Sequence, residues 1–368
     1  MGDAVSALLI KILVIVAGLA AVVCITVGVI FGINHFKDPD SGSDKGDSVQ
    51  TGGDVDPSDN GGNENKSHNN GQPLYKTNAT RSSYIGTTND DTKLIEGIKS
   101  NNAILVELGG YTVVASKGAD EKIYPASMTK VMTLIVACER VTDLDEMLKV
   151  KKEHVDFLAQ SGGSAAHAFS EGEYLRVEDV LNLVIYDSDT IACLLLAERF
   201  GGSEAGFVAL MNNKAAELGL SSTNFKNATG LYDPEHYTTC REMGAIMSYA
   251  FENELAKKIL TSWEGYRFNS YDSEGGVRNS YLSWSDWYSG RFNDNPYIKN
   301  GSKTVVTVLA GKTGYEDIPR NCFVTYATDT NGVGYVSVVV GRSDASQDGV
   351  TAAESTADMK YIYKNYVK

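Results

Sequence analysis

The chain has 368 residues, 42% of them hydrophobic and 22% charged, and it carries a formal net charge of −14 at pH 7. This acidic composition argues against a nucleic-acid-binding surface, which needs clustered Lys and Arg to neutralise phosphates. The five cysteines are widely spaced without a CxxC pair, and the five histidines show no HExxH spacing. We therefore expect buried free thiols, no metal site and no cofactor.

The first residues predict a membrane anchor. Residues 12–33 carry no charge and consist mainly of Ile, Val, Leu and Ala, and a helix of this length crosses the roughly 30 Å hydrocarbon layer of a bilayer. A secretory signal peptide has a shorter apolar region and an A-x-A-like cleavage site, and we find no such site. We expect residues 1–37 to form an uncleaved transmembrane anchor. Lys11 and Lys37 flank its two ends, so basic residues do not set its orientation.

The following segment predicts a flexible linker. Residues 38–72 are mostly Gly, Ser, Asp and Asn with almost nothing apolar, and such a composition stays solvated because it cannot bury a core. We expect a low-complexity linker over residues 38–90 and one folded domain over residues 91–368.

Strand and helix patterns share the folded domain. Strands are indicated by β-rich runs bounded by turn residues, and helices by apolar residues recurring at spacings of three and four. The predicted strands are residues 103–108, 111–115, 304–309, 321–327 and 334–341. The predicted helices are residues 127–140, 177–200, 203–218 and 350–366. The glycine pair Gly109-Gly110 makes the first two strands a hairpin.

This order of elements predicts the fold class. Strands at both ends with helices between them indicate an α/β fold of the α+β type. We expect one antiparallel sheet that is flanked by helices and closed by the terminal strands, with a helical lobe inserted. The active site would then lie where the lobe meets the sheet.

The strongest chemical signal is residues 125–130, PASMTK. Ser127 is the only serine with a lysine three residues later, and this spacing puts Lys130 on the same helix face. Serine is a weak nucleophile at neutral pH and needs a neighbouring base. Lys130, pressed against an apolar helix, would have its pKa lowered enough to act as a neutral base. Taken alone, the motif is also consistent with an ordinary helix start and a surface lysine.

A second signal is Lys312-Thr313-Gly314, directly after a predicted strand. A strand edge binds an extended peptide through backbone hydrogen bonds, while a cation and a hydroxyl suit a substrate carboxylate. Gly314 allows a ligand to approach closely. A phosphate-binding P-loop is excluded because its template needs a glycine where Val306 stands. A plain turn after a strand is the alternative.

The third signal is Ser188-Asp189-Thr190, which precedes an apolar helical run. Ser and Asp are preferred at helix N-caps, so capping is one interpretation of both residues. The functional interpretation has Ser188 relay a proton between Lys130, Lys312 and a leaving amine. The order SxxK, then S-D-N, then K-T-G is the motif set of penicillin-binding proteins and class A β-lactamases, and here Thr190 replaces the asparagine.

Together with these motifs, three further runs echo one family over residues 91–368. They are NATGL at 227–231, HYTT at 236–239 and GKTGY at 311–315. The chain resembles the serine D-alanyl-D-alanine carboxypeptidases, the low-molecular-weight penicillin-binding proteins. This resemblance implies a β-lactamase/transpeptidase-like fold and a membrane-attached, extracytoplasmic bacterial enzyme. It also implies peptidoglycan stem peptides ending in D-Ala-D-Ala as substrate and β-lactams as inhibitors.

The resemblance also assigns roles within the site. Ser127 would be acylated, Lys130 would be its base, and Ser188 would assist protonation. Lys312 and Thr313 would hold the terminal carboxylate, and the backbone N–H of Tyr315 would complete the oxyanion hole with that of Ser127.

Thr190 would contact the substrate amide less well than the asparagine that the family pattern has. A Thr hydroxyl is shorter and offers fewer hydrogen-bonding groups than an Asn amide. This departure motivates one alternative, a wall-associated penicillin-binding scaffold with weakened catalysis.

A class A β-lactamase is a further alternative. Rapid deacylation in that class uses a carboxylate in an E-x-x-L-N segment between the second and third motifs. Residues 252–256, the candidate segment, lack the asparagine, so the sequence disfavours this alternative.

Overall fold

The computed structural model describes residues 72–79, 83–292, 295–318, 320–341 and 350–367. The predicted anchor and the first part of the predicted linker lie outside these residues. Within the described part of the chain, no helix combines the length and apolar character needed to cross a bilayer.

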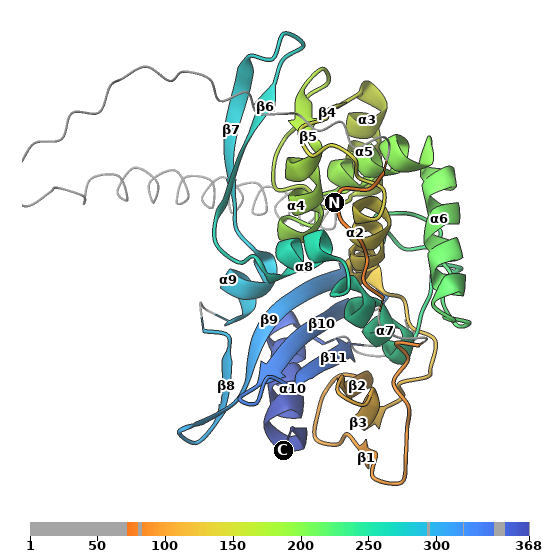
Figure 1. Cartoon of the computed structure of the whole chain (residues 1–368), viewed down its shortest axis with the longest axis vertical. Coiled ribbons are helices and arrows are strands. Elements are labelled where there is room, and N and C mark those ends of the chain that lie inside the picture. The colour runs from red at the N-terminus through yellow and green to blue at the C-terminus, as the bar shows by residue number, and fades with distance from the viewer. Residues whose placement is uncertain (1–71, 80–82, 293–294, 319, 342–349, 368) are drawn as a thin grey trace, which may run out of the picture. The chain divides into compact units, whose positions relative to one another are not determined.

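A seven-stranded sheet forms the base of the domain, with strand order β1-β3-β2-β11-β10-β9-β8 (Figure 1). All pairs are antiparallel except β1 with β3. The strands are β1 (Lys93–Leu94), β2 (Asn102–Glu107), β3 (Thr112–Lys117), β8 (Tyr297–Asn300), β9 (Lys303–Glu316), β10 (Arg320–Asp329) and β11 (Gly334–Val340). Because β2 pairs with β11, the first strands and the last strand meet, which confirms the predicted closure of the sheet.

Both faces of the sheet are covered, because side chains alternate between them along each strand. Ile104 and Val106 of β2 join one buried cluster with α7 (Cys240–Ala250). Ala103 and Leu105 join a second cluster with α10 (Ala352–Tyr366) on the other face. The sheet is therefore buried on both sides, as its Val- and Ile-rich strands require.

The helical lobe is inserted between β3 and β8 (Figure 1). Its centre is α2, in which all nine residues are buried, so the helix that starts beside Ser127 is a core element. The lobe consists of a 3₁₀ turn η1 (Ala126–Thr129) and the helices α2 (Lys130–Cys138), α3 (Lys152–Ser161), α4 (Val177–Tyr186), α5 (Thr190–Gly201), α6 (Glu204–Glu217) and α8 (Glu254–Thr261).

A second sheet of four strands flanks the lobe, in the order β4-β5-β6-β7. Its strands are β4 (Met147–Lys149), β5 (Tyr174–Arg176), β6 (Tyr266–Tyr271) and β7 (Val277–Ser283), and helix α9 (Asp286–Phe292) follows it. These strands were not predicted, because two of them have only three residues.

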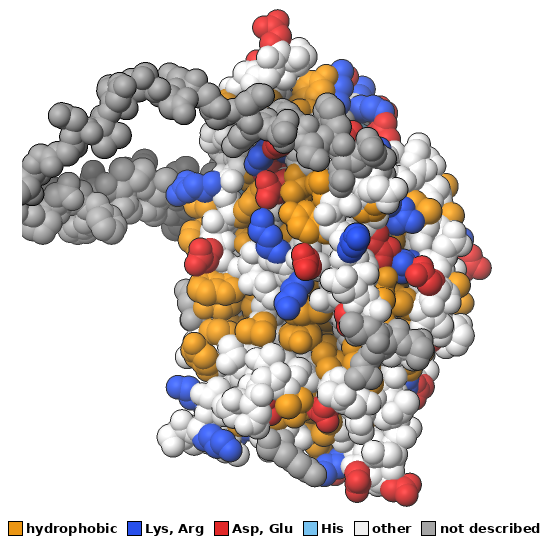
Figure 2. Space-filling view, viewed as in Figure 1, with side chains coloured by type: hydrophobic (Ala, Val, Ile, Leu, Met, Phe, Trp, Pro, Cys, Tyr) orange, Lys and Arg blue, Asp and Glu red, His pale blue; other side chains and the backbone are white. Residues whose placement is uncertain are grey.

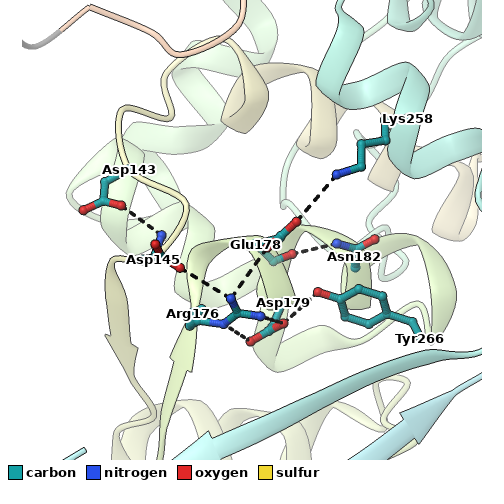
Figure 3. A network of polar contacts seen from close by, with 8 residues as sticks. All are labelled: Asp143, Asp145, Arg176, Glu178, Asp179, Asn182, Lys258 and Tyr266. Carbon is teal, nitrogen blue, oxygen red and sulfur yellow. Dashed lines mark hydrogen bonds and ion pairs between the residues drawn. The ribbon is translucent and has the colours of Figure 1, made fainter. Parts of the chain in front are cut away.

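A polar network fixes this second sheet to α4 (Figure 3). The guanidinium of Arg176 donates two hydrogen bonds of 3.0 Å to the buried carboxylate of Asp179. Tyr266 of β6 donates to the same carboxylate at 2.7 Å, and Lys258 of α8 lies 3.7 Å from Glu178. Three elements therefore meet at one end of α4.

On the face shown in Figure 2, hydrophobic side chains gather over β9 and α9. Lys and Arg side chains alternate with Asp and Glu over the lobe instead of forming one basic surface. The two most exposed tryptophans among the described residues are Trp284, 58% exposed, and Trp263, 43% exposed.

The folded domain begins earlier than composition predicts. Tyr84 is buried, Leu74 donates its N–H to the carbonyl of Val141 at 2.9 Å, and Asn78 donates to Glu252 at 2.9 Å. Residues 72–79 and 83–90, expected in the linker, thus pack on the domain. The few apolar side chains of these residues pack against the core, and the average composition of the polar segment does not reveal them.

Candidate active site

A cleft of about 660 Å³ opens where the lobe meets β9, at the predicted place. Its walls come from the start of α2, the loop after α3, the turn between α4 and α5, and β9. The lining residues that matter below are Ser127, Lys130, Gly163, Ser188, Thr190, Thr229, Trp284, Thr313, Gly314, Tyr315 and Glu316. The cleft therefore collects residues from all three sequence motifs.

Ser127 lies in η1, a tight turn that precedes α2. Ala126 has a φ of 47°, a left-handed conformation that turns the chain into the cleft before Ser127. The turn is tightly enclosed: a Cβ at Gly230 would lie 2.1 Å from the carbonyl oxygen of Ala126, and one at Gly314 would lie 3.2 Å from the Ser127 nitrogen. Glycines at these two positions allow the backbone segments to approach Ser127 closely.

Lys130 is the first residue of α2 and is 2% exposed. Its Nζ lies 3.0 Å from Ser127 Oγ and donates to the carbonyl oxygen of Thr229 at 2.5 Å. Burial lowers the pKa of Lys130, and nearby Cys193, Asp189 and Glu316 only partly offset this. A buried amine with a lowered pKa is suited to take a proton from Ser127.

Ser188 is presented to the cleft by a break in the helical lobe. The predicted helix over residues 177–200 is in fact α4 and α5, separated by Asp187–Asp189. Ser188 has a φ of 54°, and its Oγ accepts a hydrogen bond of 3.0 Å from Lys312 Nζ. Lys312 also donates to the Thr313 carbonyl at 2.9 Å. The lobe and the sheet are therefore joined at this pair.

Asp189, and not Ser188, is the N-cap of α5. Its Oδ1 accepts from the backbone N–H of Ala192 at 2.8 Å. Burial raises the pKa of Asp189 to about 7, although the Ala192 hydrogen bond and Lys130 oppose the shift. The capping interpretation is thus right for one of the two residues.

Asp187, the residue before Ser188, is held by the second sheet. Its Oδ2 accepts a hydrogen bond of 2.6 Å from Ser283 Oγ at the end of β7 and lies 3.3 Å from His167 Nε2. These contacts fix the turn that carries Ser188 from the side opposite Lys312.

Thr190 lines the cleft, as predicted for a substrate-contacting residue. Its N–H donates to the Ser164 carbonyl at 2.9 Å. Its Oγ1 is buried and has no hydrogen-bond partner within the described part of the chain. A Cβ at Gly163 would lie only 2.4 Å from this oxygen, so the hydroxyl is packed against the Gly163 backbone.

The third motif forms the far wall of the cleft on β9. Thr313 is 7% exposed, Gly314 lies against Ser127, and the side chain of Tyr315 is 53% exposed. The predicted residues of β9, namely Lys312, Thr313, Gly314 and Tyr315, therefore lie together with Ser127, Lys130, Ser188 and Thr190 in one site.

Sequence reasoning missed the loop that holds Lys130. Asn227 Oδ1 accepts from the Gly230 N–H at 2.7 Å, which shapes the turn, and Thr229 offers its carbonyl to Lys130. The run NATGL contributes to the family resemblance, but the resemblance assigns no role to it. Its sequence signal is the glycine, whose φ is 82°.

His236 braces the site without entering it. The buried ring contacts Thr129 Oγ1 through Nε2 at 2.9 Å and accepts from the Lys226 N–H through Nδ1 at 3.3 Å. Burial lowers the pKa of His236 to about 4. The ring is therefore neutral and supports the turn before Lys130, which agrees with the structural role expected from the sequence.

The chain belongs to a known family. A family model described as D-alanyl-D-alanine carboxypeptidase, peptidase family S11, matches residues 87–344. The curated relative DacF of Bacillus subtilis (strain 168), a D-alanyl-D-alanine carboxypeptidase, is 32% identical over 268 residues, which are 73% of this chain and 63% of DacF. DacC of Escherichia coli (strain K12), of the same description, is 34% identical over 191 residues, 50% of this chain and 46% of DacC. The chain thus spans less than two thirds of these relatives.

Solved structures share the fold. The DD-transpeptidase of Streptomyces K15 matches with a TM-score of 0.62 at 22% identity, covering 73% of this chain and 98% of that one. A D-alanyl-D-alanine carboxypeptidase of Mycobacterium tuberculosis matches with a TM-score of 0.59 at 20% identity, covering 75% and 95%. The predicted fold class is confirmed.

Proposed function

We propose that this protein is a serine D-Ala-D-Ala carboxypeptidase that removes the terminal D-alanine of peptidoglycan stem peptides and is acylated by β-lactams. The observation that carries the proposal is one cleft in which Lys130 Nζ lies 3.0 Å from Ser127 Oγ while Lys312 Nζ lies 3.0 Å from Ser188 Oγ. A nucleophile with its base and a hydroxyl with a cation are the parts that acyl transfer needs.

The geometry supports a definite order of steps. Neutral Lys130 takes the proton of Ser127 as Oγ attacks the carbonyl carbon of the terminal peptide bond. The N–H groups of Ser127 and Tyr315 stabilise the oxyanion. Ser188 passes a proton to the leaving nitrogen and regains one from protonated Lys130, the C–N bond breaks, and D-alanine departs. Water then hydrolyses the ester on Ser127.

Lys312 and Thr313 orient the substrate in this scheme. The ammonium of Lys312 is buried beside Ser188, and the Thr313 hydroxyl lies on the cleft wall. A substrate carboxylate placed here puts the scissile carbonyl next to Ser127, and the remaining stem peptide continues along β9 past Tyr315.

We further propose that residues 1–37 anchor the protein in the bacterial cell membrane with the catalytic domain outside the cytoplasm. The uncharged run at residues 12–33 and the location of peptidoglycan support this. Fractionation of cells that express the full chain, followed by protease treatment of spheroplasts, tests it. A domain that stays protected or appears in the soluble fraction contradicts the placement.

One observation favours a second candidate, a penicillin-binding scaffold of the cell wall with weak turnover. The Thr190 hydroxyl, where the family pattern has an asparagine amide, packs on Gly163. This scaffold would bind stem peptides without releasing D-alanine at a useful rate.

Intact-mass measurement with penicillin, together with D-alanine release from a pentapeptide, tests the proposal. The native protein should gain the mass of one penicillin and release D-alanine, and Ser127→Ala should do neither. A mass gain that survives the substitution removes Ser127 from the mechanism. Acylation without D-alanine release selects the scaffold, and rapid destruction of the drug selects a β-lactamase.

A further inference from the structure

The second half of the proposed reaction lacks an assigned base. Hydrolysis of the acyl-enzyme needs a group that takes a proton from the attacking water. The sequence offers no E-x-x-L-N segment for this purpose. Lys130 contacts Ser127 Oγ itself, so its amine is engaged with the ester oxygen when the water attacks.

Three carboxylates line the cleft, from Asp187, Glu316 and Asp317. Asp187 is occupied by Ser283 and His167. The Asp317 side chain is 94% exposed and lies 3.9 Å from Arg320. Glu316 is half-buried. Of these carboxylates, Glu316 combines partial burial with a place in the cleft that also holds Ser127 and Lys130.

The register of β9 brings Glu316 to the nucleophile's side of the strand. Side chains two residues apart share one face of a strand, so Glu316 shares the face of Lys312 and Gly314. Gly314 lies against the backbone of Ser127, where its Cβ would be 3.2 Å from the nitrogen. Tyr315 lies on the alternate face of the strand, and Asp317 lies in the turn after β9, which ends at Glu316. Glu316 therefore lies two residues beyond Gly314, on the face of β9 that meets Ser127.

The charged groups around Glu316 fit a proton acceptor. Burial raises the pKa of Glu316, aided by Asp317 and opposed by the positive charge of Lys130. Arg320 is its cross-strand neighbour on β10 but donates to the Tyr315 hydroxyl. A carboxylate whose pKa lies above its usual range is a better base near neutral pH.

From this placement we infer that Glu316 is the general base of deacylation, an inference that rests on the proposed function. Water attacks the acyl carbonyl while Glu316 takes one of its protons. The tetrahedral intermediate collapses, the C–O bond to Ser127 breaks, and the proton returns to Oγ through Lys130. The products are the shortened peptide with a new carboxyl terminus and free Ser127, so water is the only co-reactant.

The test separates the two halves of the reaction in one protein. The full chain is acylated with a fluorescent penicillin, and the rates of label gain and label loss are measured. Glu316→Gln, which keeps size and hydrogen bonding, should acylate at the native rate at a pH where Lys130 is neutral in both proteins, and it should lose the label about 100-fold more slowly. The native rate of label loss should fall as pH drops through the pKa of Glu316.

Asp317→Asn is the matched control, because it removes the neighbouring carboxylate, whose side chain is almost fully exposed to solvent. It should leave both rates within about twofold of native. Glu316→Asp keeps a shorter carboxylate and should slow label loss by about tenfold. If Glu316→Gln fails to fold, acylation of Glu316→Asp at the native rate shows that the rest of the site is intact.

Three outcomes overturn the inference. They are unchanged label loss in Glu316→Gln, an equal fall of acylation and label loss in that variant, and a comparable defect in Asp317→Asn. A native protein that never acylates instead contradicts the proposed function, so the two failures are distinguishable.

Discussion

Two buried lysines of the lobe, Lys130 and Lys214, show how surroundings decide what an amine can do. Lys130 contacts a hydroxyl and a carbonyl but no carboxylate among the described residues, and burial lowers its pKa. Burial also acts on Lys214, yet Glu217 at 2.7 Å and Glu139 at 3.0 Å outweigh it and raise its pKa. The same side chain is suited to accept a proton at one place and to remain a cation at the other.

The largest effect is expected for Lys130→Arg, and the same substitution at Lys214 is its control. Lys130→Arg keeps a positive charge that cannot be released, so acylation by penicillin should slow by about 1000-fold. Lys214→Arg keeps the positive charge that pairs with Glu139 and Glu217. The acylation rate of this variant should stay within about twofold of the native rate. Stopped-flow fluorescence measures both rates, and an active Lys130→Arg variant would remove Lys130 as base.

The pH dependence of acylation sharpens the same comparison. Below its pKa, Lys130 is protonated and cannot accept the Ser127 proton, so the acylation rate should rise with pH. Its midpoint should lie below about 10.4, the ordinary lysine value. A rate that is independent of pH across the range where the domain stays folded contradicts this assignment.

Asp189 allows that midpoint to be moved. Its carboxylate is one of the groups that raise the pKa of Lys130. Asp189→Asn keeps an N-cap for α5 but removes the charge, so the midpoint should shift to lower pH. An upward shift, or none, would show that the charge of Asp189 does not reach Lys130.

The next effect concerns stability. Glu139 accepts from Tyr249 at 2.7 Å and pairs with Lys214. Glu139→Gln leaves Lys214 with one counter-ion, so the free energy of unfolding should fall by about 2 kcal/mol. Urea denaturation measures this, while the acylation rate should stay at the native value. A loss of acylation would connect the Lys214 cluster to the cleft.

The smallest effect is expected at the other partner of Lys214. The Glu217 side chain is 64% exposed, so solvent screens its pairing. Glu217→Gln should cost less than about 0.5 kcal/mol. A cost equal to that of Glu139→Gln would mean that exposure does not separate the two carboxylates.

Much of the main sheet was predictable because its strands carry local signals. The hairpin around Gly109-Gly110 and the strands at 304–309, 321–327 and 334–341 are β-rich runs with clear ends, and the structure confirms them. The helix predicted over residues 177–200 missed the break between α4 and α5, because an apolar run at helical spacing continues through it, although the capping interpretation of Asp189 places a helix start there. Only the Asp189 cap and the contact with Lys312 show where it lies.

The three motifs of the site were predictable from the sequence, but the other residues that line the cleft were not. Ser127, Lys130, Ser188 and Lys312 follow from spacing and family resemblance, since short motifs name side chains. Thr229 and Glu316 could not be predicted, because the direction of a backbone carbonyl and the face on which a strand residue lies depend on tertiary structure. The buried state of four described cysteines, Cys138, Cys193, Cys240 and Cys322, agrees with the thiols expected from apolar runs.

The bonds that Leu74 and Asn78 make with Val141 and Glu252 have a mechanical consequence. Tension applied to the chain before residue 72 is carried in part by these two hydrogen bonds, whose acceptors lie just after the C-terminal ends of α2 and α7. A pull on this segment therefore acts beyond the C-terminal end of α2, whereas Lys130 and the cleft lie at the N-terminal end of that helix.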